Sequence, residues 1–141
     1  MTLARLTRTV TFRAAHRYFR PDWPAERNTD VFGDCAAAPG HEHLYRCRVT
    51  VAGPVSPETG MIMDLRALDL LLEEEILRRF ENRHINQDVP EFGFGKAIPT
   101  GEALAIFVWG RLATRLPAGV RLRSVRVQED PHLYAEYRGD D

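Results

Sequence analysis

Residues 41–51 constrain the fold most, because two kinds of side chain, mostly apolar and mostly polar, alternate along this segment. Successive side chains of a strand point to opposite faces. One face would therefore carry two histidines, His41 and His43, followed by mostly apolar side chains. These are Tyr45, Cys47, Val49 and Val51. The other face would be polar. We predict a half-buried strand that starts directly after a Pro-Gly turn, with the two histidines projecting together from its first residues.

A second strand is predicted over residues 6–16 by the same alternation, with Val10, Phe12, Ala14 and His16 on the inner face. His16 ends this strand, and His41 begins the next one. If the two strands pair as a hairpin, His16 lies beside His41 and His43. The segment between them, residues 17–40, is rich in Pro, Asp, Asn and Gly and is predicted to be a long loop.

Three histidines from neighbouring strands match the ligand number of a catalytic zinc site, which keeps a fourth position for water or substrate. Iron, nickel and copper also accept imidazole, but zinc is our prediction. The alternative is a pair of strand-edge histidines without a metal. A structural Cys2His2 site is excluded, because Cys47 would lie about 13 Å from His43 along an extended strand. Cys35, just before the histidines, could be a fourth ligand or a reactive thiol.

The rest of the chain predicts an α+β domain with helices on one face of an antiparallel sheet. Apolar residues at helical spacing from Leu65 to Phe80 predict one helix, on which residues 73–75, all glutamate, form a solvated face. Thr100 is the predicted N-cap of a second helix. Residues 120–130 and 133–137 predict a hairpin in which Glu129 faces inward with Val125 and Val127, and residues 60–64 predict a short strand.

Composition narrows the classes of partner. The formal net charge is −1, which gives no sign of a nucleic-acid or membrane-surface binder, and no run of 18 apolar residues occurs. We expect a cytoplasmic protein of one domain, residues 1–141, whose two cysteines are free thiols.

Several motifs together resemble the 6-pyruvoyltetrahydropterin synthase and 6-carboxytetrahydropterin synthase family. FRAAH at residues 12–16 matches F-x-A-A-H, and residues 35–45 match C-x5-H-x-H-x-Y. The later segments GMIMDL, DVPEF, PTGE and VQE follow in the same order as the landmarks of that family. The later motifs are weak singly, but together with the histidine pattern they are specific and cover nearly the whole chain.

The resemblance implies the tunnelling fold, an antiparallel four-stranded sheet with two helices on one face. It implies a homo-trimer or hexamer whose active sites lie between subunits. By the same resemblance His16, His41 and His43 bind Zn²⁺, and Cys35 is the proton-transferring thiol. Glu129 would anchor the pterin, whose amino group and ring N–H suit a bidentate carboxylate, and Thr100 and Gly101 would contact the other polar edge of the ring. An exposed strand-end role for Glu129 and a capping role for Thr100 are the alternatives.

One segment departs from the family pattern. Members commonly carry an Asp-His pair after the first helix, in which the histidine assists the cysteine, but here Glu81 and Asn82 stand at those positions. Asparagine cannot exchange a proton near neutral pH. His84 could replace the missing histidine only if its loop turns it inward; otherwise it is an exposed turn residue. We therefore name Cys35, His84 and Glu81 as the candidate catalytic residues.

The predicted function is a zinc-dependent lyase that converts 7,8-dihydroneopterin triphosphate to 6-carboxytetrahydropterin, a precursor of deazapurines such as queuosine. The alternatives are 6-pyruvoyltetrahydropterin synthesis, which eliminates triphosphate and isomerises the product, and cleavage of the side chain to 6-hydroxymethyldihydropterin. A non-catalytic paralogue that binds zinc and pterin is an alternative of another class. Three basic residues are candidates for binding the triphosphate group of the substrate: Arg27, Arg46 and Lys96.

Overall fold

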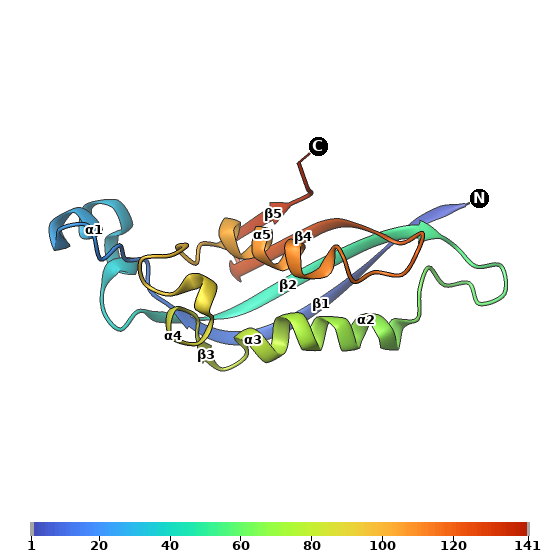
Figure 1. Cartoon of the computed structure of the whole chain (residues 1–141), viewed down its shortest axis with the longest axis horizontal. Helices are drawn as coiled ribbons and strands as arrows, with labels where there is room; N and C mark the ends of the chain where they lie inside the picture. The colour runs from blue at the N-terminus through green and yellow to red at the C-terminus, as the bar shows by residue number, and fades with distance from the viewer. Residues whose placement is uncertain (1, 141) are drawn as a thin grey trace.

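The computed structural model describes residues 2–140, which form one sheet and several helices (Figure 1). The strands are β1 (Leu3–His16), β2 (His41–Pro54), β3 (Arg83–His84), β4 (Arg121–Asp130) and β5 (Leu133–Tyr137), in the spatial order β3-β1-β2-β4-β5. The four long strands are antiparallel, as predicted. The strand β3 was not predicted: its two residues pair in parallel with Ala14 and Ala15, at the edge of β1.

The hairpin of β1 and β2 sets the geometry of the molecule. The two strands pair without a break from Leu3 opposite Pro54 to His16 opposite His41. This register places Phe12, Ala14 and His16 on the same face as Tyr45 and Cys47, and all five side chains are buried. The alternation in the sequence therefore predicts the inner face correctly.

Two long helical segments cover that face. The first begins with α2 (Leu65–Leu72), continues through a π-helical turn at Glu73–Leu77 and ends with α3 (Arg78–Phe80); the second is α5 (Gly101–Leu112), capped by the Thr100 hydroxyl. Figure 1 shows α2 running along β1 and α5 beside β4. Their buried leucines and the inner face of the sheet form one apolar cluster. The opposite face of the sheet carries mainly arginine and threonine.

Three local predictions are wrong. Residues 60–64 are not a strand, because Gly60 has a φ of 72° and the Asp64 carboxylate caps α2, which leaves too few extended residues. The predicted loop 17–40 contains α1 (Ala25–Phe32) and a 3₁₀ turn, Gly33–Ala36. This segment is held by the buried side chain of Asn28, which accepts from the Arg20 amide and donates to the Arg20 carbonyl. A further short helix, α4 (Ile85–Asp88), and a 3₁₀ turn, Pro90–Phe92, precede α5.

The third correction concerns Glu75, which was predicted to face solvent but is only 4% exposed. Its carboxylate accepts hydrogen bonds from Arg79 of the same helical segment and from Arg111 and Arg115. Burial would raise the pKa of Glu75, but the hydrogen bonds from the three arginines outweigh burial and hold the pKa below its ordinary value. The buried carboxylate therefore links the first helical segment to α5 and the turn after it through these hydrogen bonds.

We expect Glu75→Gln to lower the free energy of unfolding by about 2 kcal/mol, less than the loss of a fully buried ion pair because the arginines are partly exposed. A lowered pKa in the folded state means that this stabilisation is present above the ordinary pKa of a glutamate and is lost as the pH falls through the folded value. Urea unfolding at pH 7 and pH 3 measures both effects. Glu74→Gln, at a more exposed neighbour, is the control. Equal effects of the two variants would contradict this role of Glu75.

No helix within residues 2–140 is long and apolar enough to cross a membrane.

Candidate metal centre and active site

The three predicted metal ligands converge at one end of the hairpin. His16 and His41 are opposite each other in the β1–β2 register, and His43 follows on the same face, opposite Ala14. One ligand atom from each of these histidines lies within 4.8 Å of the other two. Such a cluster could hold a single metal ion with three imidazole ligands.

The surroundings of His16 fit a metal ligand. Its side chain is fully buried, and its Nδ1 is hydrogen-bonded to the hydroxyl of Tyr45. Its Nε2 is buried with no hydrogen-bond partner among the described residues. Burial, followed by the charges of His43 and His41, lowers the pKa of His16 to about 3, so the ring is neutral. A neutral imidazole with one nitrogen held and the other unpartnered is the usual state of a metal-binding histidine.

Gly40 explains how β2 can begin so close to His16. A Cβ atom on this residue would lie 2.1 Å from the carbonyl oxygen of His16, and the φ of Gly40 is +106°. Both the space and the conformation require glycine. The Pro-Gly turn seen in the sequence therefore brings His41 directly opposite His16.

Cys35 reaches the histidines from the 3₁₀ turn that ends the 17–40 segment. Its Sγ lies 3.7 Å from Nε2 of His41, and its carbonyl accepts a hydrogen bond from the amide of Tyr18. Burial, then the charges of Glu129 and Asp34, raises the pKa of the thiol above its ordinary value. In the chain alone Cys35 is thus a protonated thiol, and a neighbouring cation would be needed to favour the thiolate.

A cavity of about 290 Å³ begins at this thiol. Its lining includes Cys35, Thr100, Gly101 and Glu129, so the structure brings together every substrate-contacting residue expected from the resemblance. Glu129 is only 8% exposed, which excludes the alternative of a solvated strand-end glutamate. The cavity combines a thiol on one side with a carboxylate on another.

His84 lies beside the histidine cluster, whereas Glu81 does not. His84 pairs with Ala15 through β3, its Nε2 donates a hydrogen bond to the carbonyl of Pro39 at 2.7 Å, and its Nδ1 is buried without a partner among the described residues. Glu81 is exposed at the end of α3. The ring of His84 thus packs against the Pro39 turn beside His16, and within residues 2–140 no hydrogen bond joins His84 or Glu81 to Cys35.

Two tyrosines at the site were not predicted to be functional residues. Tyr18 donates a hydrogen bond to Oε1 of Glu129 at 2.9 Å, and burial, followed by the charge of Glu129, raises the pKa of this tyrosine. It therefore stays a hydroxyl donor. Tyr45 holds His16. The alternation after His43 places Tyr45 on the correct face and could have indicated its role, but Tyr18 lies in an irregular segment that carries no periodic signal.

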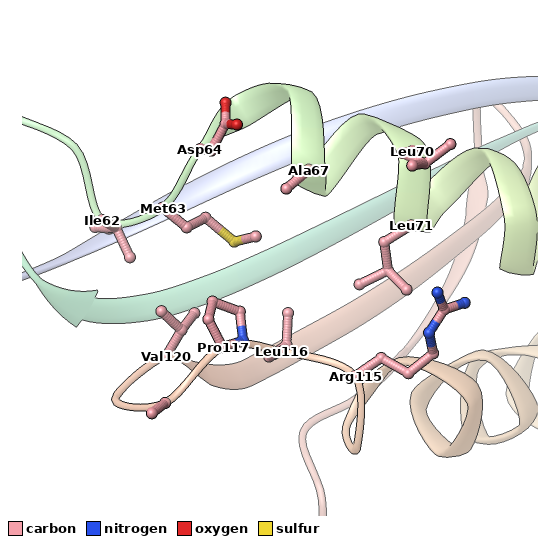
Figure 2. Close-up of a pocket in the computed structure, with 11 residues that line it drawn as sticks. Ile62, Met63, Asp64, Ala67, Leu70, Leu71, Arg115, Leu116, Pro117 and Val120 are labelled. Atoms are coloured by element: carbon pink, nitrogen blue, oxygen red, sulfur yellow. The ribbon is translucent and has the colours of Figure 1, made fainter.

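A larger groove of about 570 Å³ lies elsewhere, between α2 and residues 115–120 (Figure 2). Its walls are apolar, and its charged residues are Asp64 and Arg115. Arg115 is already paired with Glu74 and Glu75, and neither histidine nor cysteine lines the groove. The groove therefore lacks the metal-binding and thiol side chains that are found at the histidine end of the sheet.

Comparisons with known proteins agree with this geometry. The family model described as 6-pyruvoyl tetrahydropterin synthase matches residues 5–140. The chain belongs to this family. It is 35% identical over 137 residues to the human 6-pyruvoyl tetrahydrobiopterin synthase, covering 97% of this chain and 92% of that protein.

Two further relatives extend the comparison. The solved structure of 6-pyruvoyl tetrahydropterin synthase from Caenorhabditis elegans superposes with a TM-score of 0.90 at 29% identity, covering 99% of this chain and 98% of that one. A 6-carboxy-5,6,7,8-tetrahydropterin synthase from a Synechocystis species is 32% identical over 102 residues, covering 69% of this chain and 73% of that protein. The tunnelling fold is thus confirmed, with five strands where four were expected, and the family is one of lyases.

Proposed function

We propose that the protein converts 7,8-dihydroneopterin triphosphate to 6-pyruvoyltetrahydropterin and triphosphate. The observation that carries this choice is the extent of the similarity to 6-pyruvoyl tetrahydrobiopterin synthases, which spans 97% of the chain for the human protein. The relative named for the 6-carboxy product matches over a shorter part, 69%. The comparisons therefore favour the alternative from the sequence over our first prediction.

The residues present fit a resident metal ion, because the unpartnered Nε2 of His16 faces two further imidazoles. We propose Zn²⁺, held by His16, His41 and His43. When bound, zinc would supply a Lewis acid that polarises the oxygens of the substrate side chain.

The remaining steps fall to residues of the cavity. Glu129 accepts hydrogen bonds from the amino group and ring N–H of the pterin, and Tyr18 keeps this carboxylate oriented. Thr100 and the backbone at Gly101 lie on the same cavity wall and contact the other polar edge of the ring. Cys35, as thiolate, removes a proton from a side-chain carbon as triphosphate leaves, and His84 assists proton transfer. Hydrogens move from the side chain to the ring, so no external oxidant or reductant is consumed.

The open edges of the sheet favour an oligomer. Both edges of the sheet are open within residues 2–140: β1 is paired by β3 only at Ala14 and Ala15, and β5 has no outer neighbour. Open edges pair readily with other strands. We propose that β1 of one subunit pairs with β5 of the next to close a ring of three subunits, two of which rings would make a hexamer.

Product analysis tests the reaction. The metal-loaded protein is incubated with 7,8-dihydroneopterin triphosphate, and the products are separated by chromatography. We expect triphosphate and 6-pyruvoyltetrahydropterin without acetaldehyde. Acetaldehyde with 6-carboxytetrahydropterin would establish the first prediction instead, and 6-hydroxymethyldihydropterin would indicate side-chain cleavage. Binding of the substrate without turnover would indicate that the protein is a non-catalytic paralogue.

A further inference from the structure

A third hollow lies at the other end of the sheet from the histidines. It has a volume of about 340 Å³, and the residues that line it are Leu3, Ala4, Arg5, Ala52, Gly53, Gly119, Arg121 and Arg123. Three arginines thus face one hollow that contains no acidic residue. In Figure 1 this end of β1 lies beside the N-terminus, whereas α1 marks the opposite end of the long axis.

These three arginines are unlike most others in the chain. Arg5, Arg121 and Arg123 take part in no ion pair or side-chain hydrogen bond within residues 2–140. Nine of the fifteen other arginines have acidic partners: Arg8, Arg13, Arg20, Arg66, Arg79, Arg111, Arg115, Arg126 and Arg138. Three like charges without a counter-charge repel one another, and an anion between them would relieve that repulsion.

The sheet register brings the arginines together. Arg5 and Arg121 are both paired with Ala52, one from each side, so their side chains leave the same uncovered face about 10 Å apart. The small side chain of Ala52 leaves the space between them open. Arg123 lies at the bulge where the register of β4 shifts, between Ser124 opposite Thr50 and Leu122 opposite Val51. Bulges commonly re-aim a side chain, and this one adds Arg123 to the rim of the hollow.

The turn beside the hollow also leaves room for a ligand. Gly119 has a φ of +83°, and a Cβ atom there would meet no atom within 4 Å. Gly53 lies below it, where a Cβ would come within 3.1 Å of the Gly119 carbonyl oxygen. The two glycines thus allow the 117–120 turn to pack on the end of the sheet while its outer side stays open.

We propose that this hollow, the Arg5–Arg121–Arg123 site, binds an oligophosphate, either free or as the tail of a nucleotide. Guanidinium groups bind phosphate oxygens in a bidentate manner, and three of them match a chain of phosphates better than a single carboxylate. Along β1, Arg5 is 11 residues from His16, a distance of about 35 Å. The site is therefore separate from the catalytic cavity of the same chain.

Isothermal titration calorimetry with sodium tripolyphosphate tests the proposal on the metal-loaded protein at low ionic strength. The double variant Arg5→Gln/Arg121→Gln is expected to raise the Kd at least about tenfold, since each lost charge-assisted contact accounts for roughly that factor. The matched control is Arg48→Gln, an unpaired arginine on the same face but outside the hollow. His43→Ala separates this binding from binding at the metal centre. Circular dichroism checks that each variant is folded.

The proposal is supported if only the double variant weakens binding, with Arg48→Gln and His43→Ala within about twofold of the wild type. It is overturned if the double variant binds equally well, if Arg48→Gln weakens binding as much, or if His43→Ala abolishes it. Absence of binding by the wild type to both tripolyphosphate and ATP also overturns it. A tighter Kd for ATP identifies a nucleotide site, and equal values identify a site for the phosphate chain alone; both outcomes support the proposal.

Discussion

Cys35→Ala is expected to lower kcat by about 10²–10⁴-fold, the usual contribution of a positioned acid or base. The thiol lines the cavity and lies 3.7 Å from Nε2 of His41, so it faces both the proposed substrate and the metal ligands. Alanine removes the group that accepts the proton and leaves the histidines in place. Steady-state kinetics with 7,8-dihydroneopterin triphosphate measures the change.

The other cysteine provides the control for this variant. Cys47 is buried in the core, four residues beyond His43, and has no contact with the cavity. We expect Cys47→Ala to keep the kcat of the folded protein, even if its stability falls. The metal content of Cys35→Ala should equal that of the wild type. Undiminished turnover by Cys35→Ala would remove this residue from the mechanism.

Glu129→Gln is expected to raise the Kd for the pterin about 10- to 100-fold. The ionised carboxylate can accept two charge-assisted hydrogen bonds from the pterin, whereas an amide offers one acceptor and places a donor against a donor. Because Gln keeps the size and one oxygen, the bond from Tyr18 to this side chain can persist. Fluorescence titration with a non-reactive dihydropterin measures binding apart from turnover.

Glu102 is a matched control, because it lines the same cavity but lies in the first turn of α5. We expect Glu102→Gln to change the Kd less than threefold, a difference below the contribution of one charge-assisted hydrogen bond. If Glu129→Gln and Glu102→Gln weaken binding equally, the cavity attracts the ligand by general charge and Glu129 is not its anchor.

The sequence predicts the elements of this fold that have strict periodicity. Alternation located β1 and β2 and their buried face, and the spacing of Leu68, Leu72 and Ile76 located the first helical segment. Periodicity reports on side chains and not on backbone pairing. For that reason residues 60–64 looked like a strand, while the two-residue β3 left no signal.

The candidate site was predictable as far as it depends on register. Placing His16 opposite His41 needed only the assumption of a hairpin, and the structure contains that pairing. Contacts across long sequence separations were not predictable. Tyr18 and Glu129 are 111 residues apart, and Glu75 is buried against Arg111 of α5 and Arg115 of the turn that follows α5. Such contacts are set by tertiary packing, which local patterns do not encode.

The central claim is that His16, His41 and His43 hold one transition-metal ion. Elemental analysis by inductively coupled plasma mass spectrometry, on protein purified without chelators, tests it most directly. We predict about one zinc per chain for the wild type and less than about a tenth of that for His41→Ala, because a catalytic site needs three protein ligands. A wild-type protein that contains no transition metal, or a His41→Ala variant that keeps its full complement, would contradict the claim.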